Sequence, residues 1–504
     1  MEMAQVALAL LCVLGTGSAE DPFEPNWDSL LQYQCPDWFR DAKFGIFMHW
    51  GPQSVPVADD GWYARQMYIQ EGAPWGHAYA FHVEHYGHPS KFGYKDLIPL
   101  WKAEKWDPEA LIQLYKKAGA RYVVPVAVHH DNFDNYASTY QPWNSVNMGP
   151  KRDIVGEWKN AAEKYGLRFG VSTHTDRTWH WFEPAHGSDV SGPMKGVPYD
   201  GRMRKADGKG LWWKGYDPRD LYCRPHDAKQ PPDKAYIKKW FKRTRELIDK
   251  YQPDLIYFDG GLPFAEYGLR IAAHFYNANA KWHDGRNDAV LNIKSPGQRI
   301  KKAIVEDIEK GQSDTLREFP WQTDTSLNGS WFIDSSGLTL NARVVIHNLC
   351  DIVSKNGNLL LNVALMPDGS LPEDQRQILL DVGKWLEVNG EAIYGTRPWK
   401  IYGEGPTRIE GGHFKEQTKP FTAQDIRFTT KGSVLYAICL GWPGKEIQIK
   451  SLGSGGLPDF GEIRSICMLG IEKPLTFSRN QNGLTVQMPD EKPCDYAYAL
   501  KVTF

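Results

Sequence analysis

The sequence predicts an α/β protein with an irregular (β/α)8-like barrel of the TIM type, followed by a C-terminal antiparallel β-sandwich. Between residue 38 and about residue 394, short apolar runs alternate with amphipathic helical stretches, which is the pattern of repeated βα units around a parallel sheet. After Trp399 the segments become short, alternating or β-branched, and Gly, Pro and Asn turns separate them. The chain of 504 residues is also too long for one compact core of ordinary size. We therefore expect a barrel over residues 20–396 and a sandwich over residues 397–504.

The elements are predicted in order from apolar runs and from helix-capping signals. Asp107 followed by Pro108 is typical of a helix start, and Gly166 is typical of a helix end. A Gly- and Lys-rich stretch over residues 192–232 has no clear periodicity, so we expect it to form loops on the barrel rim. Barrel strands are expected at residues 44–48, 121–128, 167–173, 255–258, 289–293, 321–323 and 358–365, helices at 107–119, 153–165, 233–250, 343–354 and 373–387, and sandwich strands at 426–429, 433–440, 446–452, 463–468 and 484–488.

The first 19 residues are predicted to be a secretory signal peptide. An apolar run over residues 6–14 precedes Gly17, Ser18 and Ala19, which form a small-residue cleavage pattern. The run is too short for a membrane span, although residues 1–5 lack the usual Lys or Arg. We therefore expect a secreted or periplasmic protein, or one in a lysosome-like compartment if the cell is eukaryotic.

Composition narrows the class of binding partner. The net charge of -2, with both signs mixed along the chain, gives no basic surface for nucleic acid or for anionic lipid. Aromatic residues make up 13% of the chain, including 20 Trp, and indole rings stack well on the apolar face of a sugar, although they also fill cores. The cysteines are widely spaced without a Cys-x-x-Cys pair, so neither a zinc ribbon nor a dense disulfide framework is indicated, and one or two bridges stay open.

One predicted strand ends by presenting a carboxylate. Residues 255–258 form an apolar, aromatic-rich run of the kind a central parallel strand needs. Asp259 follows at once, and Gly260 and Gly261 then allow a sharp turn beside it. Barrel strands deliver catalytic groups to their C-terminal face in this way, whereas an isolated Asp-Gly after a strand more often starts a turn.

Other predicted strands also end in polar side chains. His49 follows the first strand, His129 and His130 follow the second, and His174 follows the third. A barrel gathers its strand ends around one pocket, so these groups and Asp259 are expected to meet. Imidazoles both donate and accept hydrogen bonds, which suits a neutral polyol such as a sugar.

The chain resembles glycoside hydrolase family 29, the α-L-fucosidases, through motifs that occur in order along nearly all of the predicted barrel. These motifs are the stretches at residues 44–52, 129–133 (His-His-Asp-Asn-Phe), 149–153, 253–260, 320–323 (Pro-Trp-Gln-Thr), 354–362 and 389–395.

The resemblance implies a retaining exo-α-L-fucosidase that hydrolyses terminal α-L-fucosyl residues of glycans or glycoconjugates through a covalent fucosyl-aspartyl intermediate, without a metal or cofactor. It assigns the nucleophile to Asp259 and places the rest of the substrate against rim loops over residues 58–88, 192–232 and 264–288. Retaining hydrolysis also needs a protonated carboxyl about 5 Å from the nucleophile. The residues that the resemblance assigns to substrate binding are His49, Trp50, Trp62, His129, His130, His174, Tyr257, Lys294 and Trp321.

The resemblance places the acid/base on a loop over residues 303–311. Glu309 fits the family spacing to Trp321 better than Glu306, which stays the alternative, and Asp307 fits less well; a solvated surface role also stays open for each. The chain departs from the family at Gly61, where a carboxylate is common, at Gln322, where a Glu is usual, and at Lys294, which replaces an Arg and has Arg299 as its alternative.

Three other readings stay open. The chain could be a catalytically impaired protein that binds fucosylated glycans on the same fold. It could also be a retaining glycosidase for a related sugar such as an α-L-galactoside. A metal hydrolase is the third reading, but we expect adjacent strand residues such as His129 and His130 to point in opposite directions, which makes them a poor chelating pair.

Overall fold

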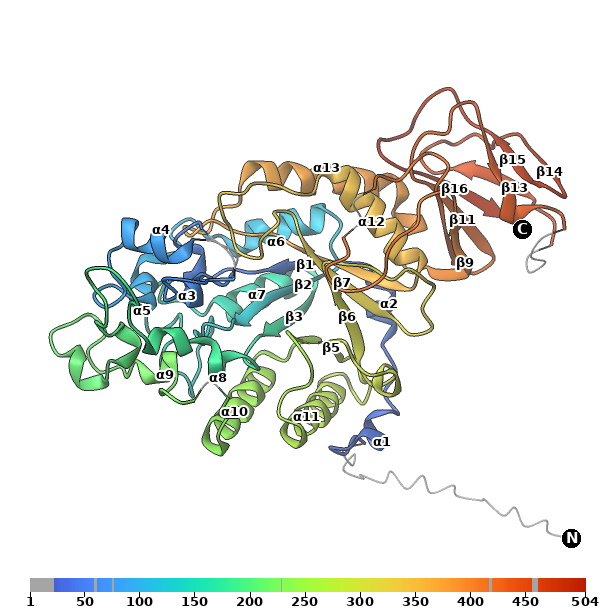
Figure 1. Ribbon diagram of the computed structural model, residues 1–504. Helices are drawn as coiled ribbons and strands as arrows, with labels where there is room; N and C mark the ends of the chain where they lie inside the picture. The colour runs from blue at the N-terminus through green and yellow to red at the C-terminus, as the bar shows by residue number, and fades with distance from the viewer. Residues whose placement is uncertain (1–21, 59–60, 75–76, 228, 417–418, 456–460) are drawn as a thin grey trace, which may run out of the picture.

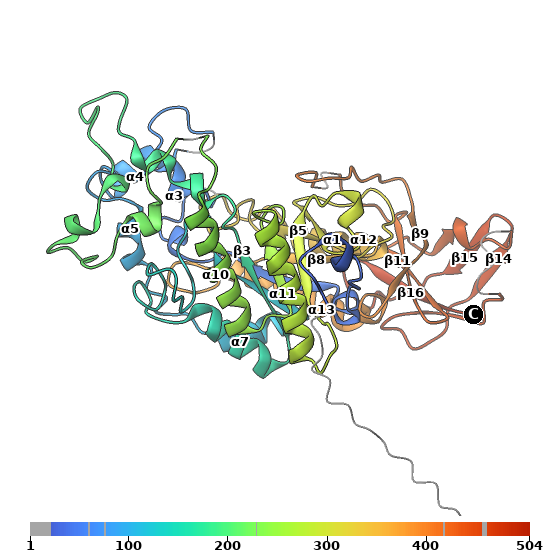
Figure 2. The same cartoon turned by 90° about the horizontal axis from the view of Figure 1, so that it is seen from below.

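The computed structural model describes residues 22–58, 61–74, 77–227, 229–416, 419–455 and 461–504. The predicted signal peptide lies outside these residues. Among the residues that are described, no helix is both long enough and apolar enough to cross a membrane. Figure 1 shows the barrel with the C-terminal strands on one side of it and the helices α3 to α5 on the other, and Figure 2 shows the same arrangement from below.

Eight parallel strands close into a barrel in chain order, which confirms the predicted fold class. The barrel closes where β1 pairs with β8, with Phe44 opposite Leu359. The strands are β1 (Phe44–Met48), β2 (Tyr122–Val128), β3 (Arg168–Thr173), β4 (Leu255–Phe258), β5 (Val290–Lys294), β6 (Val305–Glu309), β7 (Trp321–Ser326) and β8 (Gly357–Asn362).

Six longer helices cover the outside of the barrel, and their ends follow from local chemistry. The carboxylate of Asp107 caps the start of α6, and Asp153 caps α7, which ends at Gly166 in the left-handed conformation. Helices α10 and α11 pack against each other and lie side by side in Figure 2. The helices are α6 (Pro108–Lys117), α7 (Ile154–Tyr165), α10 (Lys234–Tyr251), α11 (Glu266–Trp282), α12 (Ala342–Ser354) and α13 (Glu373–Asn389). Shorter helices are α1 (Trp27–Leu30), α2 (Asp37–Ala42), α3 (Tyr63–Gln66), α4 (Ala78–His85), α5 (Tyr94–Leu97), α8 (Thr178–Trp181) and α9 (Arg219–Tyr222).

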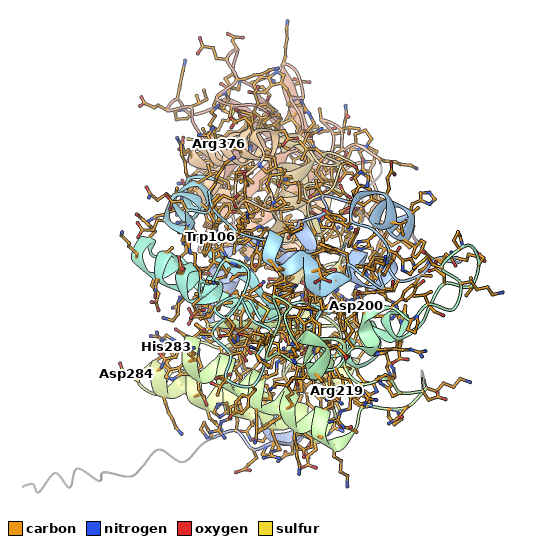
Figure 3. All side chains as sticks on the ribbon, turned by 90° about the vertical axis from the view of Figure 1, so that its left-hand side faces the viewer. Trp106, Asp200, Arg219, His283, Asp284 and Arg376 are labelled. Atoms are coloured by element: carbon orange, nitrogen blue, oxygen red, sulfur yellow. The ribbon has the colours of Figure 1, made fainter. Side chains whose placement is uncertain are left out.

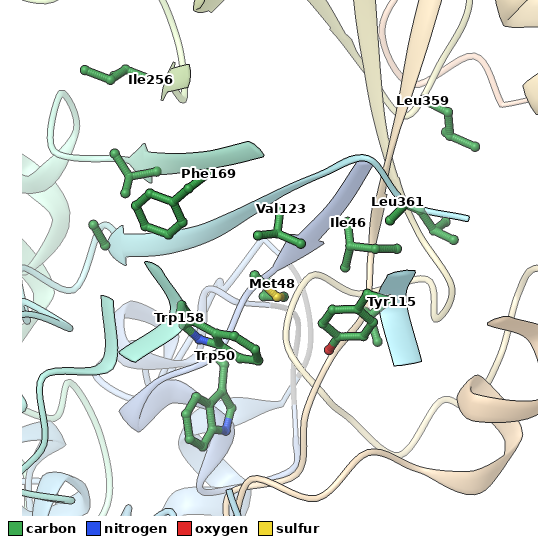
Figure 4. Packing of buried hydrophobic residues seen from close by; sticks show 14 of the residues in the cluster. Ile46, Met48, Trp50, Tyr115, Val123, Trp158, Phe169, Ile256, Leu359 and Leu361 are labelled. Atoms are coloured by element: carbon green, nitrogen blue, oxygen red, sulfur yellow. The ribbon is translucent and has the colours of Figure 1, made fainter. Parts of the chain in front are cut away.

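Side chains alternate between two apolar layers along each strand. On β1, Ile46 and Met48 point outward to the layer between strands and helices, where Tyr115 and Trp158 also pack (Figure 4). Phe47, between them in sequence, belongs to a separate cluster inside the barrel. The members of that inner cluster on other strands include Tyr122, Val124, Leu255, Tyr257, Val290, Val305 and Leu360. This parity decides which residues can reach the mouth of the barrel.

Two of the longer elements of the barrel, β6 and α11, were not predicted. Residues 303–311, expected to be a loop, contain β6, which was missed because three of its five residues are acidic. Residues 264–288, also expected to be a loop, contain α11. Phe264 and Ala265 precede α11 with positive φ and provide no capping side chain, so the sequence lacks a start signal there.

The rim stretch over residues 192–232 forms short turns around a buried charge. The carboxylate of Asp200 accepts hydrogen bonds from Tyr68 and Tyr222 and lies 3.0 Å from the ammonium of Lys95. A Cβ at Gly93 would lie 1.9 Å from Asp200, so only glycine allows this approach. Figure 3 looks at this side of the molecule and labels Asp200. A buried network of this kind orders the rim even though the sequence has no periodicity.

The C-terminal region forms two antiparallel sheets, as predicted. One sheet has the order β13-β16-β11-β10-β9 and the other has the order β12-β15-β14. The strands are β9 (Arg397–Glu404), β10 (Ile426–Lys431), β11 (Val434–Cys439), β12 (Glu446–Ile449), β13 (Ser465–Met468), β14 (Phe477–Asn480), β15 (Gly483–Gln487) and β16 (Tyr498–Thr503). Of these, β9, β14 and β16 were not predicted. None of the six cysteines among the described residues forms a disulfide.

The barrel and the C-terminal sheets are joined by a buried ionic cluster. Helix α12 packs against β9 and β10. Asp351 on α12 accepts a hydrogen bond of 2.5 Å from Arg427 on β10 and one of 2.7 Å from Lys355. All three side chains are at most 2% exposed. One carboxylate therefore neutralises two buried cations between the two parts of the chain.

Replacing Asp351 by Ala should destabilise the protein by about 3–5 kcal/mol, because Arg427 and Lys355 would stay buried without their counter-charge. Urea denaturation measures this loss of free energy of unfolding. The exposed Arg376 on α13, labelled in Figure 3, provides the control, because Arg376→Ala should change stability by less than about 0.5 kcal/mol. Equal effects of the two substitutions would show that the cluster adds nothing.

Candidate active site

A cavity of about 550 Å³ opens at the C-terminal ends of the barrel strands. A larger hollow of about 810 Å³ lies on the outer surface of α10 and α11, where Lys, Arg and exposed rings line it. We assign the site to the smaller cavity because strand-end groups converge there. Its lining residues are His49, Gly61, Trp62, Gln66, His129, His130, His174, Arg177, Asp259, Lys294, Glu309, Lys310, Asp324, Trp331 and Phe414.

Each of the eight strands supplies one inward position at its C-terminal end. On β4, Leu255 and Tyr257 point into the barrel, so Asp259, two residues further, continues the inward row. The same parity selects one residue on each other strand except β2, where the strand ends irregularly and His130 faces the cavity together with His129. The eight residues, from β1 to β8, are His49, His130, His174, Asp259, Lys294, Glu309, Asp324 and Asn362.

Asp259 lies among three cationic or proton-donating groups. The ammonium of Lys294 donates a short hydrogen bond to Oδ1, while Nε2 of His130 lies 3.1 Å and Nδ1 of His174 lies 3.4 Å from Oδ2. Burial alone would raise the pKa of this carboxyl. Lys294, His174 and His130 outweigh burial and hold the pKa of the carboxyl well below its usual range. Asp259 is therefore an anion in a nearly dry site.

His130 makes two contacts that both need an N–H group. Its Nδ1 lies 2.7 Å from the backbone carbonyl oxygen of His174, which can only accept a hydrogen bond. Its Nε2 faces the Asp259 carboxylate, which also only accepts. His130 is thus held between the backbone carbonyl of His174 and the carboxylate of Asp259.

Lys294 connects Asp259 to a second carboxyl. Its ammonium lies 2.5 Å from Oε2 of Glu309 and is bonded at the same time to Asp259. Two oxygens that share one donor at ordinary hydrogen-bond lengths are at most about 6 Å apart. Burial raises the pKa of Glu309 to about 7. The ammonium of Lys294 lowers this pKa, whereas the charges of Asp324 and Asp259 raise it. The site thus holds one ionised carboxylate and one carboxyl that keeps its proton near neutral pH.

Asp324, which lines the cavity, and Asp307, which lies beneath it, form a second pair of carboxyl groups. The hydroxyl of Tyr257 lies 3.0 Å from Asp324 and 3.3 Å from Asp307, and Gln322 donates to Asp307 at 2.8 Å. Burial, together with the charge of Asp324, raises the pKa of Asp307 well above its usual range. Asp307 is therefore a neutral acid in the floor and does not face the cavity, whereas Glu309 on the same strand lines it.

Three histidines of the cavity are neutral. Burial is the main cause that lowers the pKa of His174 to about 4 and lowers the pKa values of His49 and His129 well below the usual range. His49 donates from Nδ1 to Asn362 at 2.9 Å, which leaves its Nε2 as an acceptor. Gln53 donates to Nδ1 of His129 at 2.7 Å, which makes its Nε2 a donor. Together these rings offer both halves of a hydrogen bond, as sugar hydroxyls require.

The histidines also test the metal reading. Ring nitrogens of His49, His129 and His174 lie within 4.8 Å of one another, and so do ligand atoms of His130, His174 and Asp259. However, Nδ1 of His129 already accepts a hydrogen bond from Gln53, so Nε2 of this ring carries the proton and offers no lone pair to a metal ion. The donor set suits hydroxyl groups better than a metal ion.

The prediction that His129 and His130 point in opposite directions is wrong. Both line the cavity, and their ring centroids are 4.5 Å apart. Strand β2 ends at Val128, and its pairing with β3 shifts register between Val126 and Val128. Past this irregularity the two-residue alternation of a strand no longer applies.

Four sequence-predicted residues lie away from the cavity. Trp50 and Trp321 are outward-facing, and their indole N–H groups donate to the carbonyl oxygens of Met366 and Lys355. Glu306 also faces outward and pairs with Lys301 and Arg317 at 2.7 Å. Arg299 is exposed and pairs with Asp28. The first three lie on the outward face of the barrel, and Arg299 lies on the surface. Of the other predicted residues, Trp62 lines the cavity and Tyr257 lies in its floor.

Several cavity residues were not singled out from the sequence. Asp324 and Asn362 continue the inward rows of β7 and β8, so correct strand parity would have identified them. Gln53, which orients His129, carries no motif signal. The remaining unpredicted lining residues are Gln66, at the end of the short helix α3, and Arg177, Lys310, Trp331 and Phe414, which lie outside the helices and strands.

Comparisons with known proteins agree along the whole chain. The family model described as alpha-L-fucosidase matches residues 10–391, and the model of the alpha-L-fucosidase C-terminal domain matches residues 418–503. Tissue alpha-L-fucosidase of Bos taurus is 30% identical over 95% of this chain and 91% of its own length. The human tissue enzyme is 30% identical over 98% and 96%. A crystal structure of Thermotoga maritima alpha-fucosidase with a mechanism-based inhibitor superimposes with a TM-score of 0.72, at 28% identity over 96% of this chain and 100% of that one.

Glu309 should titrate near pH 7 in the free protein. Carboxyl ¹³C NMR of protein with labelled Glu measures this, and Glu309→Gln identifies the resonance. Lys294→Met should raise the pKa values of both Glu309 and Asp259, because the ammonium favours their charged forms. A midpoint near the ordinary value of about 4.3 in the unaltered protein would contradict the burial argument.

Proposed function

The chain belongs to the α-L-fucosidase family, and from this membership and the site geometry we propose that it hydrolyses terminal α-L-fucosyl residues with retention of configuration. The single observation that carries the mechanism is the ammonium of Lys294, which joins Asp259 and Glu309. Retaining glycosidases hold their two carboxyl groups about 5–5.5 Å apart, and inverting ones about 6.5–9.5 Å apart. A shared hydrogen-bond donor favours the shorter class.

In the first step, Asp259 is the nucleophile. An oxygen of its carboxylate forms a bond to the anomeric carbon while the bond from that carbon to the glycosidic oxygen breaks. Glu309 gives its proton to the departing oxygen, so the leaving group departs as a neutral alcohol. The low pKa of Asp259 and the raised pKa of Glu309 match these two roles at near-neutral pH.

In the second step, the roles reverse. Glu309, now ionised, removes a proton from water, and the water oxygen attacks the anomeric carbon and releases Asp259. Burial is the main cause of the raised pKa of Glu309, and the smaller contribution from the charge of Asp259 disappears once Asp259 is esterified, which favours ionised Glu309. Lys294 touches both carboxyls and therefore balances whichever one is negative in each half-reaction.

The surrounding residues support sugar binding. His49, His129 and His174 are neutral rings that accept from or donate to hydroxyls, and Trp62 supplies an aromatic wall. The presence of both carboxyl groups argues against the impaired binding protein. The predicted partner stays a fucosylated oligosaccharide or glycoconjugate, and the signal-like N-terminus supports secretion or delivery to a lysosome-like compartment.

Asp259 should be labelled covalently by a 2-deoxy-2-fluoro-fucosyl fluoride, since the fluorinated intermediate breaks down slowly. Peptide mass spectrometry locates the adduct, and NMR of the first-formed sugar should show retention. Asp259→Ala should abolish both labelling and turnover. Release of the opposite anomer, or labelling at another side chain, would remove Asp259 from this role.

Glu309→Ala should lower turnover of unactivated fucosides by about 100- to 10,000-fold, the usual contribution of a general acid, and less for aryl fucosides. Azide should partly restore aryl fucoside cleavage by replacing water as the second nucleophile. In the unaltered enzyme, kcat/KM for unactivated fucosides should fall as pH rises above about 7, because Glu309 loses its proton. Glu306→Ala is the matched control, and an azide response there instead would move the assignment to Glu306.

A further inference from the structure

A short segment between β9 and β10 of the C-terminal region lies at the mouth of the cavity. We define the mouth segment as residues 411–416. The backbone N–H of Gly412 donates to Gln312 at 3.0 Å, and that of Phe414 donates to the carbonyl oxygen of Glu309 at 2.8 Å. Further along, Thr325 on β7 donates to Glu416 at 2.6 Å. The mouth segment is therefore attached to β6 and β7 along its length.

The mouth segment approaches the barrel very closely at Gly311. A Cβ at Gly311 would lie 1.9 Å from the carbonyl oxygen of Gly412, so any other residue would push the mouth segment away. Gly311 follows Glu309 by two residues. The close approach therefore occurs directly beside the residue that we propose as the acid/base.

His413 connects the ends of the two strands that carry Lys294 and Glu309. Its Nδ1 accepts a hydrogen bond of 2.9 Å from the backbone N–H of Glu309, and its Nε2 donates to the hydroxyl of Ser295 at 2.8 Å. One neutral tautomer makes both bonds. Burial lowers the pKa of His413, and nearby Lys294 lowers it further, which keeps Nδ1 available as an acceptor. His413 thus fixes the ends of β5 and β6 relative to each other.

Phe414 is an exposed ring that lines the cavity. Its exposed fraction of 66% is the highest among the large exposed apolar side chains of the described residues. Its φ of 55° lies in the left-handed region that an aromatic residue rarely adopts. Such a conformation persists only where neighbours determine it, which here is the hydrogen bond to Glu309. The ring is thus held in water next to the proton donor.

We propose that His413 and Phe414 form the leaving-group side of the active site, with Phe414 stacking on the sugar that carries fucose and His413 positioning Glu309. The proposal rests on the proposed function. A general acid must touch the glycosidic oxygen, so whatever lies beyond Glu309 faces the leaving group and not fucose. A flat apolar ring in that place fits the C–H face of a pyranose.

The test of Phe414 compares two substrates, α-L-fucosyl fluoride, whose leaving group is a single atom, and a fucosyl disaccharide. In Phe414→Ala, the ratio of kcat/KM for the disaccharide to that for the fluoride should fall about 5- to 10-fold, the loss of one aromatic stacking contact. Phe414→Trp should restore the ratio. Tyr140→Ala, which removes a half-exposed ring far from the cavity, should leave both values unchanged.

An unchanged ratio in Phe414→Ala would overturn the stacking role. A fall only for octyl α-L-fucoside, with the disaccharide unaffected, would overturn the choice of a sugar as the stacked group. If the unaltered enzyme cleaves neither fucosyl fluoride nor the disaccharide, the proposed function is wrong. This result can be distinguished from failure of the stacking role, in which both substrates are cleaved but the ratio does not change.

The test of His413 uses leaving groups of different basicity. His413→Ala should steepen the dependence of kcat/KM on leaving-group pKa, because a misplaced Glu309 protonates the oxygen less well. His413→Asn keeps an acceptor near the position of Nδ1 and should recover most of the unaltered dependence. An equal fall for all substrates, fucosyl fluoride included, would mean that His413 only stabilises the fold. Gly311→Ala, which displaces the mouth segment without changing either residue, should combine both effects.

Discussion

The site depends on the ion pairs that the ammonium of Lys294 makes with Asp259 and Glu309. A buried Asp259 and a buried Glu309 at hydrogen-bond distance from one donor would repel each other if both were charged. The cation, together with His130, stabilises the charge on Asp259, while burial keeps the proton on Glu309. In the proposed mechanism the total charge of the pair stays the same in both half-reactions, so the surrounding dipoles need little rearrangement.

The barrel explains how these groups come together. The strands place inward side chains at their C-terminal ends, and the layer below these side chains includes Tyr257 and protonated Asp307. Outward neighbours, such as Trp321, pack between strands and helices and stabilise the fold. Because side chains alternate along a strand, one residue can line the cavity while the next packs against the helices.

Much of the fold and part of the site could be predicted from the sequence. Apolar runs and caps located most of the barrel strands, and polar residues after those strands led to His49, His174 and Asp259. Strand β6 could not be found, because three acidic residues give it a poor strand propensity, and such conflicts are expected at functional sites. Trp50 was misplaced because one residue along a strand reverses the face. His413 could not be linked to Glu309, since only tertiary packing brings together segments so distant in the chain.

The attachment of the mouth segment has an evolutionary consequence. The barrel residues that hold the reacting carboxyls are constrained by one another, so they change together or not at all. Phe414 belongs to the appended sheets and has no role in charge balance, so drift at this position could alter which glycans are accepted while bond cleavage is preserved. Selection among leaving groups would then reside in the C-terminal region, while the barrel keeps the cleavage chemistry.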